Sequence, residues 1–452
     1  MNFLKRFQTN TLVMIGNTLE YYDLYLYIHL AFLINKHFFP DIEPDNQILK
    51  IFSLVSMYFV APLASIFWGI YGDLIGRKKV LILGSFLMAF STSIIMIIPN
   101  YNWWPESLKI MPIFLLFILR ILQGIAIAGE PLAAKLYSIE NLQASKKDEN
   151  IIISKIIPMN VATMSMTQSV GGMIALGIAG LSINFLSWEH AWRIPFIVAF
   201  LSCGFIFYLR FFVSETKEYI NAPFNKRFSI LNTEEIRKHF NSLRFSKVAF
   251  FACAILCFSY PCIFVFNFTV LSPIVVKKFG YTQEFLINYN FIITFFEFLF
   301  TYLTVYIPIK LNFDKKITML VYHVIVAVCM LTFYFGKIDK DLPLWYYITL
   351  QIFMISFVNW NLIFGSIIKS LPVLQRFTQM SLAFAIGKLI TFFLSILIVP
   401  YFCGNENIQN YCLILLVVLG FSMIAVCFYI PYEKSDYTEH LRLKKHLAKL
   451  NM

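Results

Sequence analysis

Long apolar runs separated by short polar turns fill the chain from end to end. Each run has about 20 or more mainly apolar residues, the length that a helix needs to cross ~30 Å of hydrocarbon. The runs lie at approximately Thr11–Ile34, Ile51–Tyr71, Val80–Pro99, Ile110–Leu132, Ile156–Leu186, Trp192–Val213, Val248–Val276, Leu286–Ile309, Ile317–Phe335, Leu344–Ile368, Thr378–Pro400 and Tyr411–Ile430. This pattern predicts an all-α membrane protein with about twelve transmembrane helices.

The longest hydrophilic segment lies at 214–247, between the sixth and seventh runs. It predicts an N-terminal six-helix bundle at 1–213 and a C-terminal six-helix bundle at 248–431, joined by a linker at 214–247. A basic tail follows at 432–452. We expect both the linker and the tail to be cytoplasmic.

Composition and charge agree with a membrane protein. Of the 452 residues, 59% are hydrophobic and only 14% are charged, too few to cover the surface of a soluble domain. Most Lys and Arg fall in alternate polar turns, which predicts a multi-pass protein with both termini cytoplasmic. We expect the membrane to be a bacterial inner membrane. The same bias accounts for the net charge of +12, so we expect the lipid bilayer, and no nucleic acid, as a partner.

The turn after the second run combines glycines with charged residues. It has the pattern Gly-x-x-Gly-Asp-x-x-Gly-Arg-Lys, made by Gly69, Gly72, Asp73, Gly76, Arg77 and Lys78. Glycines let two helices and a tight turn approach closely, and the carboxylate can pair with basic groups. The pattern resembles the signature loop of the major facilitator superfamily, and that resemblance implies that these six residues latch a cytoplasmic gate.

Charged residues inside the apolar runs are candidates for proton coupling, because a charge in a bilayer needs a partner or a wet cavity. The first run has Glu20, Asp23 and Tyr27 along one stripe, and the fourth has Arg120, Gln123 and Glu130. We expect Asp23 and Arg120 to form a pair that protonation switches, with Glu20 as a competing proton site. The candidate proton-coupling residues are Asp23, Glu20, Arg120 and Glu130. A purely structural salt bridge is the alternative.

Four stretches narrow the family: 16–23, 120–130, 192–196 and 210–219. Together they resemble the metabolite:proton symporters, a family that includes proline/betaine transporters and α-ketoglutarate and citrate permeases. The resemblance covers roughly residues 11–220. It implies the major facilitator fold, with two six-helix bundles, and transport without a cofactor or a metal.

The second half departs from the family pattern, so the solute stays open. The turn that should repeat the signature loop keeps Asp314 but lacks its glycines. Polar residues inside the runs are candidate substrate contacts: Tyr27, Gln123, Tyr260, Asn267, Asn290, Glu297, Asn359, Asn361 and Lys388. Alternatively, such residues only bridge helices, at about 0.6 kcal/mol each. Glu297 and Lys388 are also candidates to pair, and Pro261 is expected to break the seventh helix.

These features predict a secondary active transporter that works as a monomer and carries a small zwitterionic or anionic metabolite together with protons. The solute would be proline- or betaine-like, or a di- or tricarboxylate, and Cys403 and Cys412 form a candidate disulfide on the outer side. A proton-independent facilitator or exchanger is the near alternative. A membrane-embedded enzyme is a distant one, because the seven His have no metal or acid–base spacing.

Overall fold

The computed structural model describes the chain except for residues 1, 31–33, 35–36, 39–46, 142–154, 186–190, 221–246, 283, 337, 339–340, 372–374, 395–407 and 451–452. Cys403, most of the predicted linker and the side chains of the tail therefore lie outside the description. The candidate disulfide and the exact limits of the predicted domains stay predictions.

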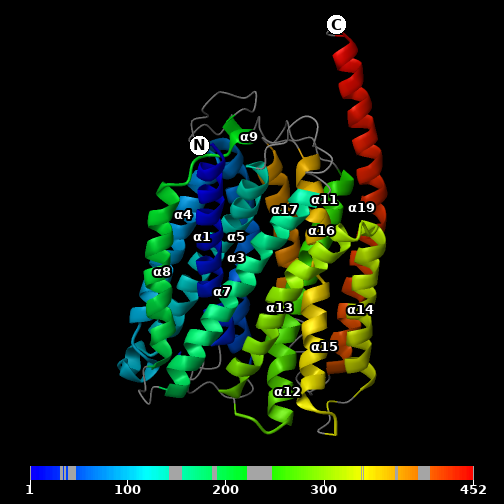
Figure 1. Ribbon diagram of the computed structural model, residues 1–452. Helices are drawn as coiled ribbons and strands as arrows, with labels where there is room; N and C mark the ends of the chain where they lie inside the picture. The colour runs from blue at the N-terminus through cyan, green and yellow to red at the C-terminus, as the bar shows by residue number, and fades with distance from the viewer. Residues whose placement is uncertain are drawn as a thin grey trace.

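The fold is all-helical, and its helices stand side by side along one direction (Figure 1). The first half of the chain forms α1 (Asn2–His29), α3 (Gln47–Ile75), α4 (Arg77–Ile97), α5 (Met111–Glu140), α7 (Ile157–Phe185), α8 (Ile194–Phe211) and the short α9 (Lys217–Ile220). The second half forms α11 (Lys247–Val265), a π-helical turn (Phe266–Leu271), α12 (Ser272–Lys278), α13 (Phe285–Lys310), α14 (Lys315–Phe335), α15 (Leu344–Phe357), α16 (Asn361–Ser370), α17 (Arg376–Phe393) and α19 (Ile408–Leu450).

The described helices fit a bilayer in length and in polarity. Nine of those in the described part are long and apolar enough to cross a membrane. Large apolar side chains such as Phe67, Phe205 and Phe428 are exposed, whereas Arg120 and Arg210 are fully buried. An apolar exterior around a polar interior reverses the pattern of a soluble protein, as lipid contact requires. The predicted membrane fold is confirmed.

The two halves pack against each other along two helix pairs. Helix α3 of the first half lies against α17 of the second, and α7 lies against α13. Figure 1 shows α1 to α8 on one side of the molecule and α11 to α19 on the other, with both chain ends at the same end of the bundle. We call that end the terminal end.

Several predicted helices differ from the structure, and α1 and α19 extend well beyond their predicted runs. The seventh run continues through Pro261 and changes to π-helical turns only at Phe266–Leu271, so the expected break at the proline is wrong. The tenth run divides into α15 and α16 at residues 358–360. Helix α5 extends to Glu140, which moves Lys135 from a predicted loop into the helix.

Candidate functional site

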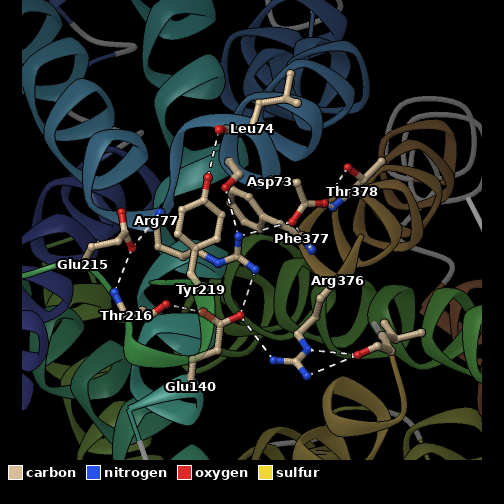
Figure 2. Close-up of polar contacts among 12 residues, drawn as sticks. Asp73, Leu74, Arg77, Glu140, Glu215, Thr216, Tyr219, Arg376, Phe377 and Thr378 are labelled. Carbon is tan, nitrogen blue, oxygen red and sulfur yellow. Dashed lines mark hydrogen bonds and ion pairs between the residues drawn. The ribbon is translucent and has the colours of Figure 1, made fainter. Parts of the chain in front are cut away.

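At the terminal end, Asp73 of α3 caps the first turn of α17 in the other half (Figure 2). The first amides of a helix lack partners within the helix, and no side chain of α17 itself caps them. The Asp73 carboxylate accepts the backbone N–H of Phe377 at 3.2 Å and that of Thr378 at 2.8 Å, together with the Thr378 hydroxyl at 2.7 Å. The dipole of a helix stabilises a carboxylate at its N-terminus. Asp73 therefore joins the two halves at a position where the dipole of α17 stabilises its negative charge.

Glu140, the last residue of α5, joins two arginines beside this cap. Its Oε1 lies 2.8 Å from Arg77 and 3.3 Å from Arg376 of the second half, and its Oε2 accepts the Thr216 hydroxyl at 2.7 Å. Arg77 also lies 3.3 Å from Asp73. The buried chain Asp73–Arg77–Glu140–Arg376 therefore alternates in charge and crosses from one half to the other. We call it, with Phe377 and Thr378, the latch.

Gly76 and Glu215 hold the turn that begins α4. Gly76 has a φ of 97°, which favours glycine, and a Cβ there would lie 2.1 Å from Glu215 Oε2. Glu215 accepts the N–H groups of Arg77 at 3.1 Å and Lys78 at 3.2 Å, so it caps α4 from beyond α8. Burial raises the pKa of Glu215, although these amide hydrogen bonds oppose the rise.

Gly69 and Gly72 bring α3 into contact with α17. A Cβ on Gly72 would lie 1.7 Å from a ring carbon of Phe377, and one on Gly69 would lie 2.9 Å from the Thr378 Cα. Any side chain at these positions would therefore separate the two helices. The backbone approach that Asp73 needs to reach the α17 amides depends on both glycines.

Within the first half, Asp23 and Arg120 meet through Gln123. Asp23 Oδ2 accepts the Thr92 hydroxyl at 2.8 Å and Gln123 Nε2 at 3.1 Å, while Gln123 Oε1 accepts Arg120 at 2.7 Å. The Arg120 guanidinium also lies 3.7 Å from the centre of the Tyr27 ring, a cation–π contact. The structure thus shows a relayed contact where the sequence predicted a direct pair, because Gln123 occupies the space between the charges.

Glu20 and Glu130 share the guanidinium of Arg210. Arg210 donates to Glu20 and lies 3.4 Å from Glu130, which also accepts the Ser85 hydroxyl. Gly16 leaves the space for this arginine, since a Cβ there would lie 2.7 Å from its guanidinium. Two buried carboxylates on one guanidinium leave one negative charge that a proton can neutralise.

A cavity of about 50 Å³ lies between the halves. Its lining residues come from both sides: Lys135, Ser165, Gln168, Tyr260, Glu297, Thr301, Ile355, Asn359, Trp360 and Asn361. Two hydrogen bonds cross it, from Gln168 Nε2 to the Tyr260 hydroxyl at 3.0 Å and from the Ser165 hydroxyl to Asn361 Oδ1 at 3.0 Å. Tyr260 donates in turn to Glu297 at 2.7 Å. The cavity has room for a few water molecules.

The halves also meet farther from the terminal end than this cavity. His29 of α1 lies 3.4 Å from Asn290 of α13, and its ring packs edge-on against Phe268 at 5.2 Å. Tyr25 packs against Phe264 at 5.3 Å. The halves therefore meet on both sides of the cavity, through the latch toward the terminal end and through this aromatic layer farther from it.

Comparison with known proteins identifies the family. The family model of the Major Facilitator Superfamily matches residues 38–395. The chain belongs to this superfamily. Membership places it among transporters rather than enzymes, as the sequence predicted.

Relatives of this superfamily member support the narrower resemblance. A putative metabolite transport protein of Haemophilus influenzae is 32% identical over 244 residues, 53% of this chain and 52% of the relative. The proline/betaine transporter of Escherichia coli is 32% identical over 208 residues, which cover 46% of this chain and 39% of the relative. The shikimate transporter of Escherichia coli is 31% identical over 193 residues, which cover 40% of each chain. The resemblance to metabolite transporters is confirmed, although the chain spans about half the length of the curated relatives it matches, or less.

Solved structures confirm the major facilitator fold. A proton:xylose symporter bound to 6-bromo-6-deoxy-D-glucose matches with a TM-score of 0.74 at 15% identity, over 95% of this chain and 96% of the other. The transporter FucP in its outward conformation matches with a TM-score of 0.64 at 14% identity, over 92% and 98%. At such identities the likeness concerns the fold.

The structure divides the predicted substrate contacts of this superfamily member into two groups. Tyr260, Glu297, Asn359 and Asn361 line the cavity. Gln123 and Tyr27 belong to the Arg120 cluster, Asn290 contacts His29, and Asn267 donates to the Gln351 carbonyl between α15 and the π-helical turn. Lys388 donates to the Ile127 carbonyl at 3.4 Å and Glu297 bonds to Tyr260, so these two residues do not pair.

The sequence did not single out several residues of the site. Glu140, Gln168 and Lys135 were assigned no role, and Arg210 and Glu215 appeared only within a family motif. Glu140 and Lys135 could have been identified as candidates because each is a charged residue close to the end of an apolar run. Gln168 gave no signal, because an isolated amide in an apolar run also fits a helix bridge.

Proposed function

We propose that this chain is a secondary active transporter that carries a small zwitterionic or anionic metabolite together with protons by alternating access. One observation carries the proposal: a carboxylate of one half caps a helix of the other half, beside a cavity that both halves line. Bonds that cross the halves must break whenever the latch opens. A rocking motion of two bundles around a central site needs such a reversible contact.

The proton would act at the buried acids of the first half. Glu20 and Glu130 share Arg210, and Asp23 reaches Arg120 through Gln123. Protonation of one carboxylate would weaken its interaction with the arginine. The arginine could then bind another partner in the next state of the transport cycle. A membrane potential of 100 mV supplies about 2.3 kcal/mol for each charge that moves inward.

The placement of the protein follows from the basic turns. We propose a bacterial inner membrane in which the terminal end is cytoplasmic, so that the latch is the cytoplasmic gate. The proposed bundles span 1–213 and 248–431, the linker spans 214–247, the basic tail spans 432–452, and a monomer suffices. The names of the relatives, proline/betaine and shikimate transporters, support a small polar solute.

The rival function is a facilitator or exchanger that moves the same solutes without protons. In that case the buried acids would serve only to hold helices together. Uptake would then follow the solute gradient alone.

Uptake into proteoliposomes separates these functions. The labelled solutes are proline, glycine betaine, shikimate, α-ketoglutarate and citrate, each with and without an inward proton gradient. We expect one class to accumulate above its outside concentration only with the gradient, and an uncoupler to abolish that accumulation. Downhill uptake that ignores the gradient and is unchanged in Asp23→Asn and Glu20→Gln would support the facilitator instead.

A further inference from the structure

The central cavity contains one cation and one anion that do not neutralise each other. Among its described lining residues, Lys135 of α5 and Glu297 of α13 are the charged ones. No ion pair within 4.0 Å joins them in the described part of the chain, and the Lys135 ammonium lies over the Phe364 ring at 5.5 Å. Each charge inside a bilayer protein needs a partner or water.

Two residues that line the cavity also have polar atoms without a partner in the described part of the chain. Asn361 is 7% exposed and lines the cavity, and its Nδ2 donor has no hydrogen-bond partner among the described residues. Glu297 is 2% exposed, and its Oε2 acceptor likewise lacks a partner there. An unsatisfied buried donor or acceptor costs about 1–3 kcal/mol, so such atoms are normally occupied by water or by a ligand.

The N-terminus of α16 adds positive electrostatic potential near the Asn361 Nδ2 donor. Helix α16 begins at Asn361, its preceding residues Asn359 and Trp360 also line the cavity, and no side chain caps it. A helix N-terminus favours an anion because its free amides and dipole are both positive. Lys135 and the start of α16 therefore favour a carboxylate together.

We propose that Lys135 and the N-terminus of α16 bind the carboxylate of the transported solute, while Glu297 binds its cationic group. This inference rests on the proposed transport function and narrows its solute to a zwitterion. Trp360 and Tyr260 line the same cavity, and aromatic faces attract ammonium groups as well. A di- or tricarboxylate would bring a second negative charge toward Glu297 and is disfavoured.

Lys135 also lies close to the latch along its helix. It precedes Glu140 by five residues, about 7.5 Å along α5 at 1.5 Å per residue. The solute carboxylate would thus occupy the part of the cavity nearest the gate. For the solute to enter, the Gln168–Tyr260 and Ser165–Asn361 hydrogen bonds across the cavity must separate.

Equilibrium binding to the purified full-length protein tests this inference. Proline and glycine betaine are the zwitterionic probes, and α-ketoglutarate is the dianionic one. We expect wild type to bind at least one zwitterion and Lys135→Gln to weaken that binding about tenfold or more, the usual effect of losing a charged hydrogen bond. Lys135→Arg, which retains the positive charge, should restore most of the affinity. Glu297→Gln should weaken zwitterion binding more than α-ketoglutarate binding.

Lys316→Gln is the matched control. Lys316 of α14 is another half-buried lysine, and it is not among the cavity residues. Its substitution should leave solute affinity within about twofold of wild type, and the thermal unfolding of every variant should be compared to exclude misfolding.

Two results would overturn the inference and leave the transport function standing. One is zwitterion binding that Lys135→Gln and Lys316→Gln change equally. The other is uptake of a carboxylic acid by a protein that binds no zwitterion. If no solute of either class is taken up, the transport function itself fails.

Discussion

At the scale of single residues, an aspartate caps a helix in each half, but the two caps have different structural roles. Asp314 caps its own helix by accepting the N–H of Lys316 at 2.8 Å and of Ile317 at 3.3 Å. Asp73 stands at the corresponding turn of the first half and caps α17 of the other half. One aspartate therefore stabilises a local helix, and the other stabilises a contact between halves.

This difference predicts how the two aspartates respond to substitution. Asp73→Ala removes three buried hydrogen bonds to a charged group, each worth about 1.5–3 kcal/mol, and should favour the open latch. We expect slower uptake and faster labelling, by a thiol reagent, of a cysteine placed at Thr301 in the cavity of a protein without its native cysteines. Asp314→Ala should cost only about 1 kcal/mol of stability and leave the labelling rate unchanged. Equal labelling in both variants would contradict the role of the latch.

Glu215 gives a pH-dependent prediction. Because burial raises its pKa in the folded protein, the group favours folding below its unfolded pKa and loses that contribution as pH rises through the folded value. Glu215→Gln keeps an uncharged acceptor and does not titrate. The unfolding temperature of Glu215→Gln relative to wild type should therefore rise as the pH increases above about 4.5. A constant difference would show that the capping hydrogen bonds balance burial, and a difference that falls with pH would show that they outweigh it.

At the scale of elements, α3 and α17 are held in contact by small residues. Gly69 and Gly72 let Phe377 and Thr378 approach the α3 backbone, and the cap by Asp73 follows from that approach. Close contact through small residues is how helices associate in a bilayer, where apolar burial alone gives no driving force. The contact between α3 and α17 therefore depends on the shape of this helix pair as much as on its charges.

Gly72→Ala tests this dependence. Its methyl group would lie 1.7 Å from the Phe377 ring, so α3 and α17 must separate or the ring must move, at a cost of about 1–3 kcal/mol. We expect uptake to fall and the cavity to label faster, as for Asp73→Ala. Gly204→Ala in α8 is the control, because a Cβ there meets no atom within 4 Å. That variant should retain uptake and unfold at the same or a slightly higher temperature.

At the scale of the whole molecule, the cavity lies between two layers of contacts that join the halves. The latch lies toward the terminal end, and the layer around His29 and Phe268 lies on the other side. Alternating access requires each layer to open while the other stays closed. Bonds across the halves must therefore change during the cycle, while bonds within a half can persist.

Cross-linking separates these two kinds of contact. A short bifunctional thiol reagent that joins cysteines placed at Ser165 and Asn361 should stop uptake, because these residues bond across the halves at 3.0 Å. A reductant that cleaves the link should restore it. The control joins cysteines at Ser138 and Asn160, which bond within the first half. Uptake that survives the first link or fails with the second would contradict motion between rigid halves.

Much of the fold followed from sequence, because the bilayer imposes it. Each span needs about 20 apolar residues with all backbone groups bonded internally, so hydropathy alone located the spans. It did not locate every helix end, because α1 begins nine residues before its predicted run and α5 and α19 continue beyond theirs. The positions at which helices are interrupted could not be predicted from the sequence. Pro261 remains within α11, while a π-helical turn forms at Phe266–Leu271, where hydrogen bonds with Gln351 stabilise it. Such breaks depend on partners from other helices.

The site divides in the same way. The sequence determined that this chain spans a bilayer, that its first half has a motif resembling the superfamily's signature loop, and that charges such as Asp23, Glu20 and Arg120 must have functional or structural partners. Those partners were decided only by the tertiary structure, which placed Gln123 between Asp23 and Arg120 and gave Glu20 and Glu130 to Arg210. The reason is physical. A charged residue within an apolar run shows by itself that burying it costs free energy, whereas its counter-charge comes from whichever helix packs beside it.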